Sequence, residues 1–395
     1  MLRGTPFHAR TSALCEAQNW RRWSGYLVAS SYELTHEREY ASIRSAAALI
    51  DISPLFKYRL SGPDALRLLN RMVTRDVSRC AVGQVIYTPW CDEAGKVIDD
   101  GTIARLDEQT FRLTAADPNL RWLSMNAFGL KVDIEDVSDS IAVVALQGPT
   151  SRDILKQVSD ADLDRLKYFR LTTTKVRDMS VTISRTGYTG DLGYEIWIDA
   201  DNALAVWGAL MQAGEVYGIT PAGMLALDVA RIEAGLLLIE VDYTSAHKAL
   251  IESRKSSPFE LGLGWTVSLD KGSFVGRRAL IEEQRRGSAW QFVGVEVDWE
   301  SIERLYFEVG LPPQLPATAW RTSVPIYSPS RQIGYASSGC WSPLLKKTIA
   351  LAHLEAAYAQ PGTPVRMEIT VEHQRKQASA RVAQLPFFNP ERKRS

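Results

Sequence analysis

Residues 181–198 constrain the fold more than any other stretch, because three evenly spaced glycines interrupt two runs of strand-like residues. Val181 and Ile183, and then Ile196 and Ile198, recur at every second position, as strand residues do. The segment between carries these glycines and two tyrosines: Gly187, Gly190, Gly193, Tyr188 and Tyr194. Glycine accepts positive φ and lets another backbone or a flat ligand approach closely, so we expect a hairpin whose turn faces one of the two. A hairpin that binds nothing explains the same pattern.

The composition excludes several classes of protein. The chain of 395 residues has 46 basic and 46 acidic side chains, so its formal net charge is zero, whereas a general nucleic-acid binder has a basic excess. The 4 cysteines lie outside any CxxC pattern and the 5 histidines show no ligand spacing, so we expect no disulfide framework and no metal site. We find no membrane-spanning run and no leader-like segment. A cytoplasmic protein without membrane contact is therefore expected.

The order of the expected elements indicates an α+β fold with several lobes. Residues 1–35 read as an irregular lead-in rich in aromatic side chains. Strand, helix, two hairpins, helix and strand follow one another in 53–137, which is typical of a small α+β lobe. Residues 138–286 combine a continuous apolar run, the hairpin described above and amphipathic helices. From 287 onward short strands alternate with turn clusters, which predicts a small antiparallel β-barrel or sandwich, and the polar tail 389–395 is expected to fray.

Six motifs in a fixed order carry a resemblance to a known family. They lie at 95–100 (GKVIDD), 184–198 (SRTGYTGDLGYEIWI), 227–236 (LDVARIEAGL), 264–267 (GWTV), 274–280 (FVGRRAL) and 337–343 (SSGCWSP). Together they resemble the glycine-cleavage T-protein family, the tetrahydrofolate-dependent aminomethyltransferases and their demethylase relatives. A single glycine-rich turn would be weak support, but several motifs in the right order are specific.

The resemblance implies a three-lobed fold. The first lobe would be discontinuous, formed by residues 1–52 and 138–286, and would bind folate. A ferredoxin-like α+β lobe, 53–137, would be inserted into it, and residues 287–395 would form the C-terminal antiparallel β-barrel. Tetrahydrofolate would lie in the middle, where the lobes meet, because ligand pockets often form at such junctions.

The resemblance also implies roles for residues of the cofactor site. Glu195 would hold the pterin ring, with Tyr188 and Tyr87 beside it. Arg231 would meet the carboxylate side of folate, where a planar guanidinium suits the charge. Trp265 would pack on the aminobenzoyl part. For each of these residues an ordinary structural role is the alternative.

Asp99 and Asp100 are adjacent at the end of an expected strand, so their side chains point to opposite faces and only one can enter a given pocket. By the resemblance, the catalytic aspartate near N5 and N10 of folate falls on Asp99. Asp100 would then hold the turn. Two solvated turn carboxylates would also explain the pair.

The sequence departs from the family on the side where the one-carbon donor would enter. The family's Asp-Val-Ser-His step reads DISP at 51–54, which loses the histidine, and the usual N-terminal signatures are not recognisable. We therefore expect a small methylated N-, S- or O-donor taken from solution rather than a lipoyl carrier protein. Four aromatic side chains could face such a donor: Trp20, Trp23, Tyr87 and Trp90.

Three other functions stay open. The chain could be a true glycine-cleavage aminomethyltransferase, the folate-side partner of an amine dehydrogenase, or a folate-binding protein without catalysis. An aspartate retained at the 95–100 motif favours an enzyme over a passive binder. The oligomeric state is not indicated by the sequence.

Overall fold

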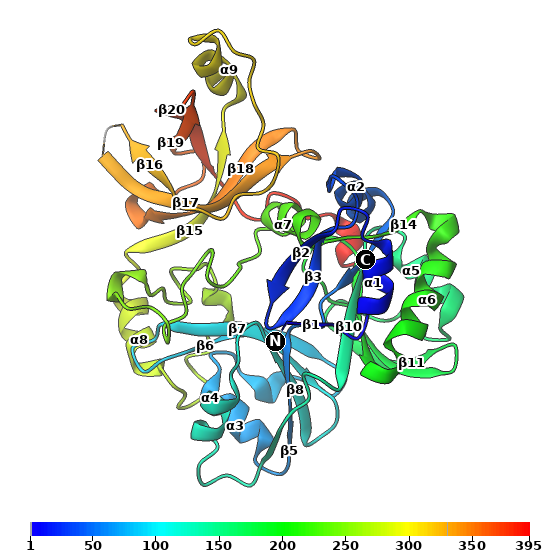
Figure 1. The fold of residues 1–395 in the computed structure, drawn as a ribbon. Coiled ribbons are helices and arrows are strands. Elements are labelled where there is room, and N and C mark those ends of the chain that lie inside the picture. Colours follow the sequence, from blue (N-terminus) through cyan, green and yellow to red (C-terminus); the bar gives the residue numbers. More distant parts are fainter. Residues whose placement is uncertain (1, 330) are drawn as a thin grey trace.

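The computed structural model describes residues 2–329 and 331–395, and it contains four β-sheets that meet around the middle of the molecule (Figure 1). The N-terminal segment is regular, so the expectation of an irregular lead-in was wrong. Helix α1 (His8–Leu14) precedes a three-stranded sheet of order β1-β3-β2, formed by β1 (Arg3–Gly4), β2 (Asn19–Trp23) and β3 (Tyr26–Ser31). A reverse turn with positive φ at Ser24 and Gly25 joins β2 to β3, and β3 packs on the central helix α7.

A six-stranded sheet of order β11-β12-β13-β10-β4-β14 forms the first lobe, and it combines strands from both sides of the insert. The strands are β4 (Ala47–Asp51), β10 (Ile141–Gln147), β11 (Leu171–Val176), β12 (Met179–Ser184), β13 (Gly193–Asp199) and β14 (Ile219–Pro221). Helices α5 (Ser151–Val158) and α6 (Ala203–Gly214) cover one face, and α2 (Glu37–Ser45) and α7 (Met224–Glu233) cover the other.

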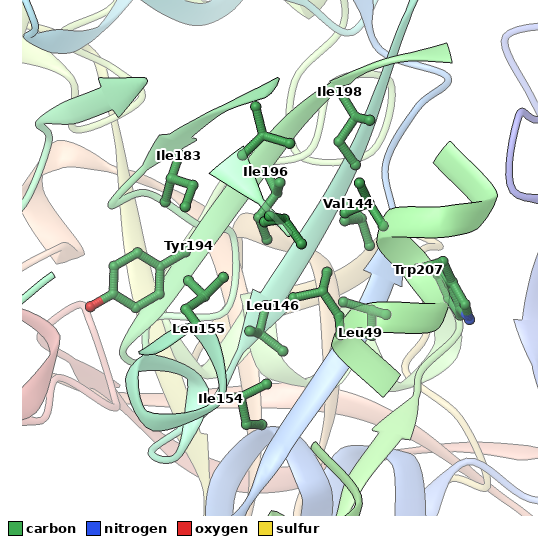
Figure 2. Packing of buried hydrophobic residues seen from close by; sticks show 14 of the residues in the cluster. Leu49, Val144, Leu146, Ile154, Leu155, Ile183, Tyr194, Ile196, Ile198 and Trp207 are labelled. Atoms are coloured by element: carbon green, nitrogen blue, oxygen red, sulfur yellow. The ribbon is translucent and has the colours of Figure 1, made fainter. Parts of the chain in front are cut away.

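Both faces of this sheet are buried, as the continuous apolar run in β10 predicts. Leu146 and Ile196 point to the side of α5 and α6, where Trp207 of α6 joins them (Figure 2). Ala145 and Trp197 point to the opposite side, toward α2 and α7. The strict alternation fixes the register, because a slip of one residue would exchange the two faces.

The insert is a five-stranded antiparallel sheet of order β6-β7-β8-β5-β9 with two helices on one face. Its elements are β5 (Phe56–Ser61), α3 (Ala65–Met72), β6 (Val85–Cys91), β7 (Val97–Arg105), β8 (Thr110–Ala115), α4 (Leu120–Asn126) and β9 (Asp133–Asp136). Apolar side chains of the sheet pack on α3 and α4, and the opposite face is largely polar and looks toward the other lobes.

The C-terminal lobe is a closed barrel of order β15-β18-β17-β16-β19-β20, which confirms the predicted barrel. Its elements are β15 (Trp290–Val297), α9 (Trp299–Phe307), β16 (Val324–Ser328), β17 (Arg331–Ser342), β18 (Lys347–Glu355), β19 (Pro364–Val371) and β20 (Gln374–Ala383). Before the barrel, residues 237–280 pack on the β6–β7 hairpin of the insert, with helix α8 (Arg277–Arg286) at its tip. The lobe boundaries at 52/53, 137/138 and 286/287 stay a prediction.

The tail after β20 is ordered and returns to the first lobe, so the expectation of a frayed end was wrong. The backbone N–H of Phe388 donates to the carbonyl of Glu233 at 2.8 Å. The Phe388 ring lies against the guanidinium of Arg44, 4.4 Å from its carbon. Arg392 pairs with Asp191 at 2.6 Å. These contacts connect the end of the barrel to the glycine turn between β12 and β13.

Candidate functional site

The glycines between β12 and β13 make room for protein rather than for a ligand. A Cβ atom at Gly187 or Gly193 would collide with the side chain of Gln147, and Gly190 has φ +75° and faces Ala234. The Gln147 amide holds the turn by donating to the Thr186 carbonyl at 3.2 Å. The predicted hairpin is confirmed, and of the two expected neighbours of its glycines the structure shows protein.

Glu195 lies on β13, half-buried, on the same face of the sheet as Trp197. One carboxylate oxygen accepts a hydrogen bond from the Thr186 hydroxyl at 2.7 Å. Burial raises the pKa of Glu195, and the Thr186 hydrogen bond and the charge of Arg112 oppose this shift. The other carboxylate oxygen is available to a ligand with N–H donors.

Asp99 and Asp100 occupy opposite faces of β7, as strand alternation requires. Asp99 is 0 % exposed and accepts hydrogen bonds from the Asp100 N–H at 2.8 Å, the Asp117 N–H at 3.2 Å and the Asn119 amide at 2.7 Å. Burial raises the pKa of Asp99 well above its ordinary value. Enclosed by three donors, this carboxylate organises the loop after β8 and offers no free oxygen to a substrate.

Asp100 points to the polar face of the insert, where two phenols hold its carboxylate. The Tyr87 hydroxyl donates to it at 2.8 Å, and the Tyr243 hydroxyl donates to the other oxygen. Burial raises the pKa of Asp100, and the two phenol hydrogen bonds oppose the rise. Asp100 is only partly covered, so it is the carboxylate of this pair that can reach a bound molecule.

Two of the expected cofactor aromatics lie together beside this carboxylate. Trp265 sits on a short 3₁₀ turn (Gly264–Thr266) and is 64 % exposed. Its ring is 6.2 Å from that of Tyr87, nearly parallel to it, and the guanidinium of Arg75 lies 5.2 Å from the indole centre. An exposed indole backed by a second ring and a cation is a platform on which a planar group can stack.

Tyr188 is half-buried in the turn after β12, and its hydroxyl donates to the carbonyl of Leu237. Burial raises its pKa, and among the smaller contributions is the charge of Asp100, which places the two side chains in the same region. Tyr188 therefore connects the glycine turn to the segment after α7 on the side where Asp100 and Tyr87 lie.

Arg231 is enclosed by protein groups, so the structure shows a structural role beside the expected one, which stays a prediction. It is 0 % exposed on α7 and forms an ion pair with Asp242. Asp242 also accepts hydrogen bonds from the hydroxyls of Ser337 and Ser338 on β17, each at 2.6 Å. Arg231 is thus part of a buried joint between the first lobe and the barrel.

The aromatic residues assigned to the donor are separated in the structure. Trp90 is 0 % exposed in the core of the insert, where its indole N–H donates to Asn119 at 2.9 Å, so it has no face for a donor and that assignment was wrong. Trp20 packs beside His8 and Cys15, on the side of α1. Trp23 packs on the central cluster with α7, so it alone of these three faces the middle of the molecule.

The loop that loses the family's histidine is stabilised by a buried lysine. Lys57 donates to the carbonyls of Ser53 at 2.6 Å and Leu55 at 2.8 Å, and burial lowers its pKa to about 8. Asp51 in the same loop accepts a hydrogen bond from Thr5 at 2.5 Å. Both charged groups serve the backbone around Pro54, so they fix the wall of the central region.

Sequence reasoning missed Tyr243, Arg112 and Asn119. Tyr243 follows the 227–236 motif by only a few residues but carries no pattern of its own. Arg112 interrupts the apolar strand Phe111–Leu113 and points to the polar face of the insert. A charged residue amid apolar strand neighbours was the available signal for Arg112, since such a residue in a buried strand needs a partner or a ligand.

Two family models match this chain. The model described as "GCVT N-terminal domain" matches residues 7–271, and that of the "Glycine cleavage T-protein C-terminal barrel domain" matches 308–389. The chain belongs to the glycine-cleavage T-protein family. Tetrahydrofolate is the cofactor of this family, and the chain is accordingly a tetrahydrofolate-dependent transferase.

Curated relatives of two kinds resemble the chain. An aminomethyltransferase of Halothermothrix orenii is 35 % identical over 89 % of this chain and 90 % of its own length, and one of Bacillus pumilus is 33 % identical over 98 % and 99 %. A trimethylamine-oxide aldolase of Ruegeria pomeroyi is 33 % identical over 100 % of this chain, which spans only 48 % of that relative.

Among solved structures, the glycine cleavage system aminomethyltransferase T of Bartonella henselae has the same fold. It superimposes with a TM-score of 0.83 over 98 % of this chain and 99 % of its own, at 24 % identity. This likeness confirms the three-lobed T-protein fold expected from the motifs. Within the described residues, we find no helix with both the length and the apolar character needed to cross a membrane.

Proposed function

We propose that this transferase moves a nitrogen-bound one-carbon unit to tetrahydrofolate, as an aminomethyltransferase does. The observation that carries the proposal is the carboxylate of Asp100, held by Tyr87 and Tyr243 on the face of the insert that looks across to Glu195. Glu195 would bind N–H donors of the pterin, and Asp100 would act near N5 and N10. This reassigns the expected catalytic role from Asp99 to Asp100.

The arrangement supports catalysis because a carboxylate at Asp100 can hold a proton at the reacting nitrogen. The two phenols fix its oxygens, and burial raises its pKa, which moves the group toward the range useful for acid–base work. A passive binder of folate would have no need of a partly buried carboxylate clamped between two tyrosines. Trp265, exposed beside Tyr87, would stack on the aminobenzoyl ring.

The names of the relatives favour a donor carbon attached to nitrogen. Aminomethyltransferases handle an aminomethyl group by name, and trimethylamine oxide is also an amine derivative. The first candidate is therefore an aminomethyl donor, which makes the glycine-cleavage alternative better supported than a sulfonium or methyl ether donor. An aminomethyl donor would also bring the lipoyl carrier protein back as a partner.

The second candidate is a small N-methylated amine or N-oxide taken from solution. It is favoured by the trimethylamine-oxide aldolase, which matches 100 % of this chain, and by Pro54 in place of the family's histidine at the donor side. In that case the bound carbon would enter past Trp23, which faces the middle from β2.

A donor screen tests the proposal. The protein is incubated with tetrahydrofolate and either aminomethyl-lipoyl carrier protein or single amines: trimethylamine N-oxide, dimethylglycine, betaine, and, as non-nitrogen controls, a sulfonium acid and a methoxy-aromatic acid. Mass spectrometry reads methylene- and methyl-tetrahydrofolate. We expect product only from nitrogen donors. Product only from the sulfonium or methoxy compound would overturn the nitrogen assignment, and none from any donor would favour a binding protein.

A further inference from the structure

Arg112 is a buried cation that the structure leaves without a charged partner. It projects from β8 of the insert and is 5 % exposed, with its guanidinium carbon 3.6 Å from the ring centre of Trp197 on β13. Among the described residues, its Nε has no hydrogen-bond partner and no carboxylate lies within ion-pair distance of the guanidinium. A buried guanidinium with an unused donor is costly unless a ligand accepts from it.

The surroundings of Arg112 show a space that a ligand could enter. A groove of about 420 Å³ runs between the insert and the first lobe, and its walls include Arg112, Trp197 and the hydroxyls of Thr182 and Ser180. Glu195 lies two residues before Trp197 on the same face of β13, and its charge raises the pKa of Arg112, which burial lowers to about 9. Glu195 and Arg112 are therefore close, yet they do not form an ion pair.

The register of the insert places Arg112 in line with the proposed catalytic carboxylate. Asp100, Thr102 and Ala104 follow one another on the polar face of β7, and Arg112 is paired with Ala104 across the ladder. Four residues of strand separate the rows of Asp100 and Arg112 by about 13 Å. The distance between these two rows can be bridged by a bicyclic pterin that lies beside Asp100 at one end and meets the extended side chain of Arg112 at the other. A small donor whose carbon reacts beside Asp100 would not reach Arg112.

We propose that Arg112 binds the 4-oxo oxygen of the pterin, while Glu195 accepts from the N3–H and the 2-amino group of the same edge. This edge presents one acceptor followed by two donors. A guanidinium can donate to the acceptor, and a carboxylate beside it can accept from both donors. The inference rests on the proposed position of the pterin at Glu195 and adds Arg112 as the residue that donates to the 4-oxo oxygen. Arg112 would then distinguish a 4-oxo pterin from a 4-amino pterin, which has a donor at that position.

Calorimetry with two ligands tests this assignment without a donor substrate. The ligands are tetrahydrofolate, which has a 4-oxo group and an N3–H, and tetrahydroaminopterin, which has a 4-amino group and no hydrogen on N3. We expect the wild-type protein to prefer tetrahydrofolate by about 10- to 100-fold, the range of a hydrogen bond to a charged group. Arg112→Met, which keeps the length of the side chain, should reduce this ratio several-fold, mainly by weakening the binding of tetrahydrofolate. The part of the ratio that comes from the N3–H at Glu195 should remain.

Arg121→Met is the control, because Arg121 is exposed on α4, which covers the opposite face of the insert and lies away from the groove. It should keep the wild-type ratio. Equal affinity of the wild-type protein for both ligands, or a wild-type ratio in Arg112→Met, would overturn the inference, and the first result needs no variant to fold. A donor screen without product alongside a reduced ratio in Arg112→Met would overturn the proposed function and support the role of Arg112.

Discussion

Replacing each of the adjacent aspartates by asparagine should separate chemistry from stability. Asp100→Asn keeps the shape, and a phenol can turn its hydroxyl to accept from the new amide, so the fold should persist. The charge near N5 and N10 is lost, and kcat should fall by about 10²–10⁴-fold, the usual contribution of a positioned acid–base group. That range corresponds to about 2.7–5.4 kcal/mol of activation free energy.

Asp99→Asn should act on the free energy of unfolding instead. The three groups that donate to Asp99 are two backbone N–H groups and the Asn119 amide, and their N–H donors cannot turn round to accept. An asparagine at this position would turn its own N–H group toward one of these N–H donors, in a site with 0 % exposure to water. We expect a loss of about 1–3 kcal/mol, the cost of one buried unsatisfied donor.

Two measurements on both variants decide the matter: kcat with the donor identified by the screen, and the midpoint of urea denaturation. The reasoning predicts low kcat and a normal midpoint for Asp100→Asn, and a lowered midpoint with largely preserved kcat for Asp99→Asn. Full activity of Asp100→Asn, combined with an inactive but stable Asp99→Asn, would refute it and restore the assignment made from the sequence.

Two further predictions concern the cofactor and the tail. Because burial raises the pKa of Glu195 and only its ionised form accepts pterin N–H groups, tetrahydrofolate affinity should fall as the pH is lowered, starting above the pH at which an exposed glutamate protonates. Calorimetry from pH 5 to 8 checks this, with Glu195→Gln expected to flatten the profile; a flat wild-type profile contradicts it. Phe388→Ala removes the ring against Arg44 and should lower the free energy of unfolding by about 1–2 kcal/mol in denaturation experiments. Asn389→Ala, at an exposed neighbour, should change nothing; equal destabilisation by both variants would exclude the cation–π contact as the cause.

The lobes were predictable because each leaves a local pattern in the sequence. Alternation in 181–198 and the apolar run of β10 specify strands, and the ordered motifs specify the arrangement. The face of a strand that looks inward is set by distant helices. Asp99 is enclosed because α3 and α4 cover its side of the insert, and nothing near residue 99 indicates which side they cover.

The roles of individual residues could not be predicted where a charged side chain has a partner from another part of the sequence. Arg231 pairs with Asp228 of its own motif at 3.5 Å, but it also pairs with Asp242, which lies outside the motif and accepts hydrogen bonds from two serines of β17. The face that Glu195 shares with Trp197 follows from strand alternation in β13, but its role as a pterin ligand stays a prediction. The environment of Arg112 could not be predicted from its own strand, because it depends on the contact of the insert with Trp197 of the first lobe.

The return of the tail has a consequence for the order in which the protein can fold. Arg44 and Asp191 belong to the first lobe, yet their partners Phe388 and Arg392 follow the last strand of the barrel. During synthesis the sheet of the first lobe can form long before those partners leave the ribosome. Within the first lobe Arg44 already pairs with Glu233 at 2.6 Å and lies 3.6 Å from Asp191. The tail therefore adds the last stabilising contacts to these buried charges only when synthesis is almost finished.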